Sequence, residues 1–320
     1  MQYSSAGNLL TNRNFILIIG LAAGLLLGDN VAFLKEFTPY LIGLILAVSI
    51  SGFDFKAFIP FRKSIIPIGV TILINYFVYG AVLLTLAGLL TNNDAYWMGY
   101  VVIAATPPAI AVIPFSINLR GNANFSIIGI VGGNVAGIIL APLIMMLFAG
   151  DKTISILAML ELITKVLIVP ILVSRLLRLT KPVFAFVENH RGVIIDYGFL
   201  FVAMTVIGVS RSMLLQHPVE AILPLAIMVF MMFGMGYILQ VILNAFRIAP
   251  QLIISNKLIL VMKNAGFASV MALSLFDNPR VVLPAAILSI LLPVYYLVQS
   301  NLNLLSMLKR QQKRKVAIQP

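Results

Sequence analysis

The chain has 320 residues, of which 61% are hydrophobic and only 10% are charged, and its mean hydropathy is +1.06. Soluble globular proteins carry about 25% charged residues, so this composition excludes a soluble fold and predicts an all-α membrane protein with several transmembrane helices. The net charge is +12, and the chain contains no cysteine, which excludes disulfides, thiolate nucleophiles and Cys-ligated metals.

Apolar runs separated by charged residues and by Gly, Pro and Asn predict ten membrane spans. We place them near residues 15–30, 37–53, 64–90, 96–117, 123–149, 154–177, 193–213, 219–246, 252–276 and 281–306. The first run follows Arg13 and lacks a small-residue cleavage site, so we interpret it as a span and not as a signal peptide. The two histidines, His190 and His217, are expected in loops.

The basic residues are distributed unevenly over the predicted loops. With both termini on one side of the membrane, sixteen of the 22 Lys and Arg residues fall on that side and four on the opposite side. Cytoplasmic loops carry an excess of Lys and Arg, so this bias predicts a multi-pass protein of the cell membrane with both termini in the cytoplasm. The basic stretch Lys309–Lys315 fits a topology determinant that could also contact anionic lipid, and nothing suggests nucleic acid as a partner.

A weak internal repeat relates the two halves of the chain. Residues 39–52 resemble residues 196–210 at an offset of about 157, and the third span maps onto the eighth at a similar offset. Because each half holds five predicted spans, the second copy must sit inverted in the membrane, a pattern typical of secondary transporters. Chance similarity between apolar segments is the alternative explanation. The predicted units are a first five-helix repeat, 1–150, and a second with the basic tail, 151–320.

Two predicted spans are interrupted by residues that disfavour a regular helix. In the fourth span Thr106 is followed by Pro107 and Pro108, and each proline removes a backbone donor and disfavours helix in the residue before it. In the ninth span Asn264 supplies a polar side chain and Gly266 tolerates unusual backbone angles. We expect both helices to be broken and to cross at the midplane, since unwound backbone in a bilayer must be buried in protein or line a wet cavity.

Lys263 lies at the centre of the ninth span, where a cation costs about 2.5–3.5 kcal/mol on insertion scales, so it is a candidate functional residue. Alternatively it snorkels to the interface or pairs with Glu161. Glu161 and Lys165 are four residues apart on one helix face, which favours mutual neutralisation and leaves a role in a site open. Asn75 and Asn134 either hydrogen-bond between helices or join the site. Two lysines against one carboxylate in the membrane interior favour an anionic substrate.

Three segments carry a resemblance to a known family. Residues 37–56 are similar to a second span followed by a basic loop, Met262-Lys-Asn-Ala-Gly-Phe-Ala268 is similar to a Met-Gln-Asn-Ser-Gly-Leu-Ala motif in a ninth span, and residues 283–289 resemble the start of a last span. In this order they resemble the bile acid:sodium symporter family, part of a wider superfamily with arsenite and auxin-efflux-type carriers. The resemblance covers nearly the whole chain. It implies ten helices in two inverted repeats, a panel domain, a core domain, and substrate binding where the fourth and ninth helices cross.

The family's sodium ligands do not carry over to this chain. The resemblance implies an acidic ligand where this chain has Ile259 and a glutamine ligand where it has Lys263. A Ser-Asn pair falls near Val112 and Ile113, which offer no side-chain oxygen, whereas Asn75 matches a polar ligand position. An ammonium group would repel sodium, so we expect Lys263 to replace the bound cation. Loss of its proton would permit proton coupling, and uniport is equally allowed.

Together these observations predict a secondary-active or facilitative transporter of a small organic anion that works by alternating access without a cofactor. An auxin-efflux-type carrier and a non-transporting membrane sensor are the alternatives. An intramembrane enzyme would need paired carboxylates, a Ser/His arrangement or a metal cluster, so we expect no enzymatic activity. The oligomeric state is not predicted. The candidate substrate or coupling residues are Lys263, Asn264, Gly266, Asn75, Thr106, Pro107, Pro108, Asn134, Glu161 and Lys165, and no metal ligands are predicted.

Overall fold

A computed structural model of the chain describes residues 13–53, 60–149, 156–216, 218–276 and 278–316. Within these residues every regular element is a helix, apart from one isolated antiparallel bridge. Seven of the described helices are long and apolar enough to cross a membrane, which confirms the prediction of an all-α, multi-pass membrane protein. These candidate spans are Phe15–Ser51, Phe61–Leu90, Ala123–Phe148, Leu157–Leu176, Lys181–Ser212, Pro218–Ala245 and Pro279–Tyr296.

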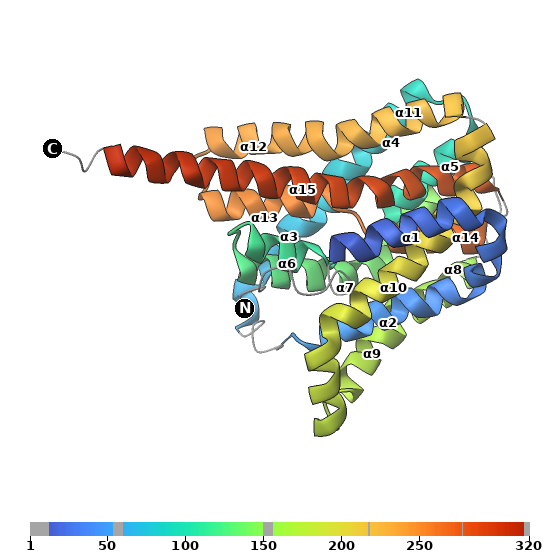
Figure 1. Cartoon of the computed structure of the whole chain (residues 1–320), viewed down its shortest axis with the longest axis horizontal. Coiled ribbons are helices and arrows are strands. Elements are labelled where there is room, and N and C mark those ends of the chain that lie inside the picture. The colour runs from blue at the N-terminus through green and yellow to red at the C-terminus, as the bar shows by residue number, and fades with distance from the viewer. Residues whose placement is uncertain (1–12, 54–59, 150–155, 217, 277, 317–320) are drawn as a thin grey trace.

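Helices occur in each of the ten predicted ranges (Figure 1). The first half contains α1 (Arg13–Leu27), η2 (Gly28–Phe37), α2 (Thr38–Ser51), η4 (Phe61–Lys63), α3 (Ile65–Ile72), α4 (Tyr79–Leu90), α5 (Asp94–Ala105), α6 (Val112–Asn118) and α7 (Ala123–Phe148). The second half contains α8 (Ile156–Ile163), α9 (Val169–Leu176), α10 (Lys181–Gln216), α11 (Pro218–Val229), α12 (Met235–Ala245), α13 (Pro250–Val261), α14 (Ala265–Leu275) and α15 (Pro279–Val316).

Three of the predicted spans contain a π-helical segment that was not predicted. These segments are η5 (Leu73–Val78) between α3 and α4, η6 (Thr164–Ile168) between α8 and α9, and η7 (Phe230–Gly234) between α11 and α12. A π-turn leaves the regular hydrogen-bond pattern of the α-helix and is frequent at functional sites. One of the three, η5, carries residues of the site described below.

The prediction that His190 lies in a loop is wrong. Residues 181–192 form the first turns of α10, and the ring of His190 lies with Nδ1 2.9 Å from the carbonyl oxygen of Phe186, one turn earlier in the same helix. The physical reason is that Pro182 stands in the first turn, where a missing N–H is tolerated, and nothing after it forces the helix to end. The other histidine, His217, lies outside the described residues.

The helices pack in two groups. In the first group α1 packs on α10, α10 on α2, and α2 on α9. In the second group α3 packs on α7, α4 on α5, α12 on α13, and α15 on both α5 and α14. The groups meet mainly along α14, which contacts α2, α8 and α10, and along α15, which contacts α10. Figure 1 shows α2, α9 and most of α10 below α12, α13 and α15; α12 and α15 run roughly along the longest axis, whereas α10 lies oblique to it.

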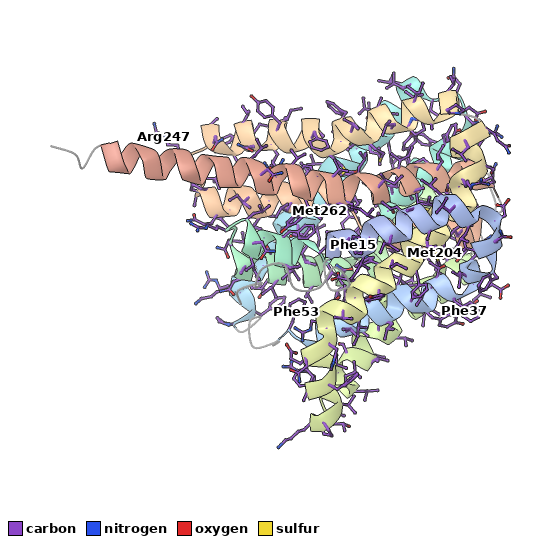
Figure 2. All side chains as sticks on the ribbon, viewed as in Figure 1. Phe15, Phe37, Phe53, Met204, Arg247 and Met262 are labelled. Carbon is purple, nitrogen blue, oxygen red and sulfur yellow. The ribbon has the colours of Figure 1, made fainter. Side chains whose placement is uncertain are left out.

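The two ends of the long axis can be located from labelled side chains. Figure 2 shows Phe37, from the end of η2, at one end of the molecule and Arg247, just after α12, near the other. The C-terminal part of α15 extends beyond the other helices at the Arg247 end (Figure 1). At 1.5 Å per residue its 38 residues span about 57 Å, well beyond the roughly 30 Å of a bilayer core.

The centre of the bundle is built from two short helices that are buried on all sides. In α5 the run from Met98 to Ala105 is buried, and in α14 the run from Ala265 to Leu273 is buried. A helix that is apolar all round must be enclosed by other helices, which explains why these two short segments lie inside the bundle. Both end at an interruption of the helix, and these interruptions form the candidate site.

Candidate functional site

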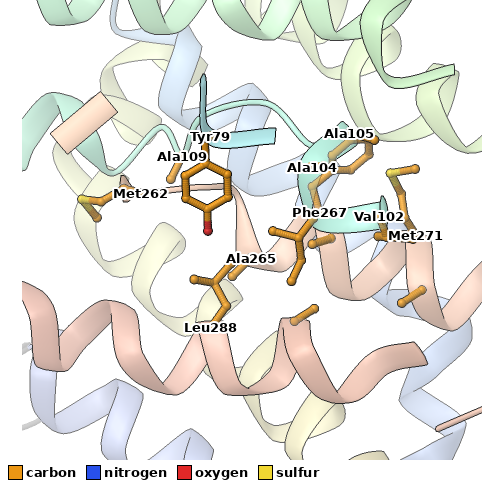
Figure 3. Close-up of a cluster of buried hydrophobic side chains, with 14 of the residues drawn as sticks. Tyr79, Val102, Ala104, Ala105, Ala109, Met262, Ala265, Phe267, Met271 and Leu288 are labelled. Carbon is orange, nitrogen blue, oxygen red and sulfur yellow. The ribbon is translucent and has the colours of Figure 1, made fainter. Parts of the chain in front are cut away.

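The two predicted interruptions exist and lie side by side. α5 ends at Ala105 and α6 begins at Val112, while α13 ends at Val261 and α14 begins at Ala265. Figure 3 shows residues of both segments in one buried cluster, with Ala109 and Met262 near each other. The unwound segments therefore meet within the protein interior, as unwound backbone at membrane depth requires.

Backbone hydrogen bonds join the two interruptions. The N–H of Ala109 donates to Met262 O at 2.8 Å, and the N–H of Asn264 donates to Pro107 O at 3.0 Å. Pro108 and Lys263 form an isolated antiparallel bridge between them. Helix ends leave unpaired N–H and C=O groups that are costly to bury, and here each interruption supplies partners for the other. If either segment were a continuous helix, these backbone N–H and C=O groups of the other segment would lose their hydrogen-bond partners.

Asn134 on α7 holds the first interruption from the side. Its Nδ2 donates to Pro108 O at 3.2 Å and to Ile130 O, one turn earlier in its own helix, at 2.8 Å. The interpretation of Asn134 as an interhelical hydrogen-bonding residue is confirmed. Its Oδ1 is buried and has no hydrogen-bond partner among the described residues.

The Lys263 side chain is fully buried between the two interruptions. Its Nζ donates to Asn75 Oδ1 at 2.9 Å and Asn75 O at 3.2 Å, to Ala104 O at 3.1 Å, and to Thr106 O at 2.5 Å. We call these four oxygen atoms the Lys263 cage. An ammonium group has three N–H donors, so four acceptors occupy all of them. Lys263 therefore neither snorkels to an interface nor pairs with Glu161.

Two features of the surroundings favour a positive charge in the Lys263 cage. Two of the carbonyl groups, Ala104 O and Thr106 O, come from the C-terminal end of α5, where the helix dipole is negative. The rings of Tyr76 and Tyr79 lie with centroids 4.9 and 5.3 Å from Nζ, within the range of cation–π attraction. The charge is solvated by dipoles and rings alone.

Among the described residues, no acidic group pairs with Lys263. It forms no ion pair with any described residue, since the ion pairs of the described chain join other residues. Figure 3 shows the ring of Tyr79 among the apolar side chains of Ala109, Met262 and Ala265. The Tyr79 hydroxyl is buried without a hydrogen-bond partner among the described residues. Lys263 is therefore a fully buried lysine that has no acidic partner among the described residues.

Asn75 contacts both Lys263 and α13, the helix that ends at the second interruption. Its Nδ2 donates to Ile259 O, in the last turn of α13, at 3.0 Å. Its Oδ1 accepts from Lys263, so one amide contacts a helix end with one atom and the ammonium group with the other. The interpretation of Asn75 as an interhelical hydrogen-bonding residue is confirmed. Asn75 and Tyr76 belong to the π-helix η5, and the sequence carries no established signal for such a segment.

Thr106 contributes its backbone to the cage and not its hydroxyl. The Oγ1 atom donates to Ile103 O at 2.8 Å, within the last turn of α5, whereas the carbonyl oxygen accepts from Lys263. Pro107 similarly contributes its carbonyl oxygen, which accepts from the N–H of Asn264. The sequence singled out these two residues as part of a break in the helix, and in the structure their carbonyl groups accept hydrogen bonds at that break.

Gly266 was predicted to provide an unusual backbone angle, and this prediction is wrong. Gly266 lies in the first turn of α14, and among the described residues only Gly28 combines a glycine with a positive φ. A Cβ atom at Gly266 would lie 2.6 Å from Cδ1 of Ile42 on α2. A larger residue at position 266 would therefore require the side chain of Ile42 to shift. Asn264 caps α14, because its side-chain oxygen accepts from the N–H of Phe267 at 3.0 Å.

Glu161 and Lys165 lie apart from the Lys263 cage. Lys165 Nζ donates to Glu161 Oε1 at 2.6 Å, which confirms the predicted pair. Their side chains are 61% and 38% exposed, respectively, and neither contributes an oxygen atom to the cage. The two intramembrane lysines therefore occupy different environments.

A buried cluster of three serines was missed by the sequence analysis. Ser116 on α6, Ser126 on α7 and Ser255 on α13 have hydroxyl oxygens 2.8–3.0 Å from one another. Ser255 Oγ also accepts from the N–H of Asn122 at 2.9 Å. The cluster fixes α6 and α13, which adjoin the two interruptions, to α7. Single serines far apart in the chain give no pattern from which such a cluster could be predicted.

Comparison with known proteins does not assign a family to the chain. Neither a scan against protein-family models nor a search among curated proteins found a match. The resemblance to bile acid:sodium symporters therefore stays a prediction that depends on the motifs around residues 37–56 and 262–268. The helices show a multi-pass membrane protein.

Proposed function

We propose that the protein is a ten-span transporter that moves a small organic anion by alternating access. The proposal depends most on the Lys263 cage, in which a fully buried lysine without an acidic partner among the described residues lies where two interrupted helices meet. Intramembrane charges are rare and mark substrate or ion pathways, and paired interrupted helices are typical of secondary transporter sites.

The arrangement of the helices supports ten spans. The long candidate span Phe15–Ser51 contains two successive helices, α1 and α2. The helices α5, α6, α13 and α14 are each too short to cross a bilayer alone. We count the pair α5/α6 as one interrupted crossing and the pair α13/α14 as another. Together with the six other long candidate spans this arrangement makes ten.

The positions of the irregular segments support two repeats. The π-helices η5 and η7 begin at Leu73 and Phe230, 157 positions apart, which is the offset predicted from the sequence. The last helical residues before the interruptions, Ala105 and Val261, lie 156 positions apart. A π-helix and a helix interruption that both recur after 156–157 positions are hard to explain by chance similarity of apolar residues. The odd number of spans per repeat would make the second copy inverted.

The two helix groups support an alternating-access mechanism. The interrupted helix α14 lies between them and contacts α2, α8 and α10 on one side and α5 and α15 on the other. A substrate bound beside the interruptions would lie at this boundary, and a shift of one group against the other would expose it to either side of the membrane. Gly266 and Ile42 are in contact across the boundary.

The contents of the cage support an anion as substrate and make coupling to sodium unnecessary. The ammonium group of Lys263 already fills the oxygen shell that a cation would need, and no described carboxylate balances its charge. Because the donors of Lys263 are all used by the cage, the lysine would attract the substrate by its charge and not by direct hydrogen bonds. The first turn of α14 adds the positive end of a helix dipole.

The proposal is tested by thermal unfolding of the purified protein against a panel of small carboxylates, each as its sodium and its choline salt. A ligand at 100 times its Kd stabilises the native state by about 2.7 kcal/mol. We expect stabilisation that depends on the anion, is indifferent to sodium, and is lost in Lys263→Gln. The matched control is Lys257→Gln in α13, the helix that ends just before Lys263, because Lys257 binds Gln240 and Gln299 outside the cage and this variant should respond as the wild type.

Transport of the stabilising anion is then measured in proteoliposomes. Uptake that follows the anion gradient without sodium supports the proposal, whereas binding without uptake would support a non-transporting sensor. Stabilisation by indole carboxylates alone would favour an auxin-efflux-type carrier. Sodium-dependent stabilisation of the wild type would contradict the assignment of Lys263 as the replacement for the cation.

A further inference from the structure

Lys257 joins three helices near one end of the second helix group. It lies on α13, and its Nζ donates to Gln240 Oε1 on α12 and to Gln299 Oε1 on α15, both at 2.8 Å. Figure 1 shows α12, α13 and α15 together at the end of the molecule near which Figure 2 labels Arg247. These three helices contain no Asp or Glu, and no described residue forms an ion pair with Lys257. Its charge is solvated here by two amide oxygens.

The lysine fixes the orientation of both amides. An ammonium group only donates, so the oxygen of each amide must face it and the nitrogen must point elsewhere. Neither Nε2 atom has a hydrogen-bond partner among the described residues, and neither is among the atoms that are buried without one. Both nitrogens are therefore open to the surroundings. Each lies within about 5 Å of Lys257 Nζ, because it shares a carbon with the oxygen that faces the lysine.

We call Lys257, Gln240 and Gln299 the Lys257 cluster. Two of the three N–H groups of the ammonium are used by the amide oxygens, which leaves one. With two N–H groups on each amide nitrogen, the cluster presents five free donors and one positive charge. Its two acceptor oxygens already face the lysine. Such a set of donors fits an oxyanion, whose oxygen atoms accept several hydrogen bonds at once.

A further donor lies one helical turn away in the seam between α12, α13 and α15. Tyr295 is four residues before Gln299 on α15, and its buried hydroxyl has no hydrogen-bond partner among the described residues. It lies beside Gly236, which is four residues before Gln240 on α12. A Cβ atom at Gly236 would be 3.3 Å from Tyr295 Oη and 3.5 Å from Lys257 Cγ. The seam therefore has donors without acceptors at two successive levels.

The Lys257 cluster lies at the depth of the phosphate groups of a bilayer. Gln240 is about 33 Å along its candidate span from Pro218, and Gln299 is about 30 Å along its helix from Pro279. The hydrocarbon core of a bilayer is about 30 Å thick, so both glutamines lie near its edge, where the headgroups begin. Exposed apolar side chains adjoin them on the same two helices, namely Tyr237, Val241, Val294 and Val298.

We propose that the Lys257 cluster binds the phosphate group of an anionic phospholipid. A phosphodiester has two free oxygens and one negative charge, so it would accept from the ammonium group and from both amides and would balance the charge of Lys257. The exposed apolar side chains would contact the acyl chains, and the bound lipid would tie α12 and α15 to α13. Phosphatidylglycerol suits the cluster because its headgroup is otherwise neutral, whereas phosphatidylcholine would bring a second cation close to the lysine.

Thermal unfolding of the purified protein in detergent tests the proposal with three ligands: dioctanoyl phosphatidylglycerol, dioctanoyl phosphatidylcholine and inorganic phosphate. A ligand at 100 times its Kd should raise the Tm of a chain of this size by about 5 °C. We expect this rise with phosphatidylglycerol, at a concentration at which phosphatidylcholine gives little and inorganic phosphate, which lacks acyl chains, gives none. An equal rise with phosphatidylcholine would refute recognition of the net charge. An equal rise with inorganic phosphate would assign the cluster to a soluble anion and overturn the lipid.

Gln299→Glu tests whether the amide donors bind the lipid. The carboxylate keeps an oxygen toward Lys257 and pairs with it, so the variant should fold, but it removes two N–H donors and adds a negative charge. We expect the half-saturating concentration of phosphatidylglycerol to rise about tenfold or more, and likewise in Lys257→Gln. The matched control is Gln251→Glu, the same chemical change at an exposed position in the first turn of α13, which should respond as the wild type.

The lipid response and the proposed transport activity can fail separately. Lys263→Gln should keep the response to phosphatidylglycerol and lose the response to small carboxylates, whereas Lys257→Gln should do the reverse. A wild-type lipid response in Gln299→Glu would overturn the proposal, and the Lys257 cluster would then be only a contact between helices. If Lys257→Gln fails to fold, the comparison of Gln299→Glu with Gln251→Glu still decides.

Discussion

Replacement of Lys263 by methionine keeps most of the side-chain volume of the lysine and removes its ammonium group. The three N–H donors make charge-assisted hydrogen bonds worth about 1.5–3 kcal/mol each, so about 5–9 kcal/mol of interaction is lost with the cage. The desolvation of a buried ammonium costs several kcal/mol, and the variant recovers that amount. We expect a net destabilisation of about 2–4 kcal/mol, because the carbonyl groups of Ala104 and Thr106 are left buried without partners.

The assay is thermal unfolding in detergent or nanodiscs, in which about 2 °C per kcal/mol for a chain of this size gives a decrease in Tm of about 4–8 °C. A second variant, Lys263→Ala, leaves a cavity in the shape of the missing side chain. n-Propylammonium has the three carbons and the nitrogen that alanine lacks, so it should bind the cage and restore stability. With a Kd of about 1 mM, 50 mM ligand would contribute about 2.3 kcal/mol.

The matched control ligand is 1-propanol, which has the same shape without the charge. Restoration by n-propylammonium and not by 1-propanol would show that the Lys263 cage recognises a cation. Equal restoration by both, or a Tm of Lys263→Met equal to that of the wild type, would refute the reasoning. In that case the lysine would be held by its hydrocarbon stem, and its charge would have no structural partner.

Three further changes follow from the contacts of the site. Asn75→Asp places a carboxylate against Lys263 and neutralises it, so we expect the stabilisation by carboxylates to disappear while the protein still unfolds cooperatively; an unchanged response would argue against an electrostatic role of the lysine. Gly266→Ala places a methyl group 2.6 Å from Cδ1 of Ile42 and should cost about 1–3 kcal/mol, which Ile42→Val should largely remove because valine lacks that atom; additive losses in the double variant would contradict the contact. Ser255→Ala removes a buried hydroxyl that accepts from the N–H of Asn122 and lies within hydrogen-bonding distance of the hydroxyls of Ser116 and Ser126, so thermal unfolding should show a loss of about 1–3 kcal/mol, and a smaller loss would indicate that water replaces the hydroxyl.

The sequence predicted the helices of this protein and the places where two of them are interrupted. Apolar runs of sufficient length leave few alternatives to a membrane helix, and Pro107 followed by Pro108 removes two successive backbone donors. The sequence also singled out Lys263, because a charge flanked by apolar residues is conspicuous in any apolar segment. These signals are all local and depend on side-chain type.

The partners of Lys263 could not be predicted in the same way. Two of the four cage oxygens belong to the backbones of Ala104 and Thr106, and every residue has a carbonyl group, so the sequence does not mark them. The π-helix that carries Asn75 has no recognisable composition, and the contact of Gly266 with Ile42 joins residues more than two hundred positions apart. Such features follow from tertiary packing, which a single sequence does not display.

The covalent attachment of the cation in the Lys263 cage has an energetic consequence. A transporter that binds a free ion draws work from the gradient of that ion, because the ion enters from one side of the membrane and leaves on the other. An ammonium group that is part of the chain returns with it, so it supplies no driving force as long as it keeps its proton. A carrier of a monovalent anion built in this way would only equilibrate its substrate with the membrane potential. At 100 mV, negative inside, about 2.3 kcal/mol per charge holds such an anion roughly 50-fold more concentrated outside the cell than inside, and the voltage alone would make the carrier an exit route.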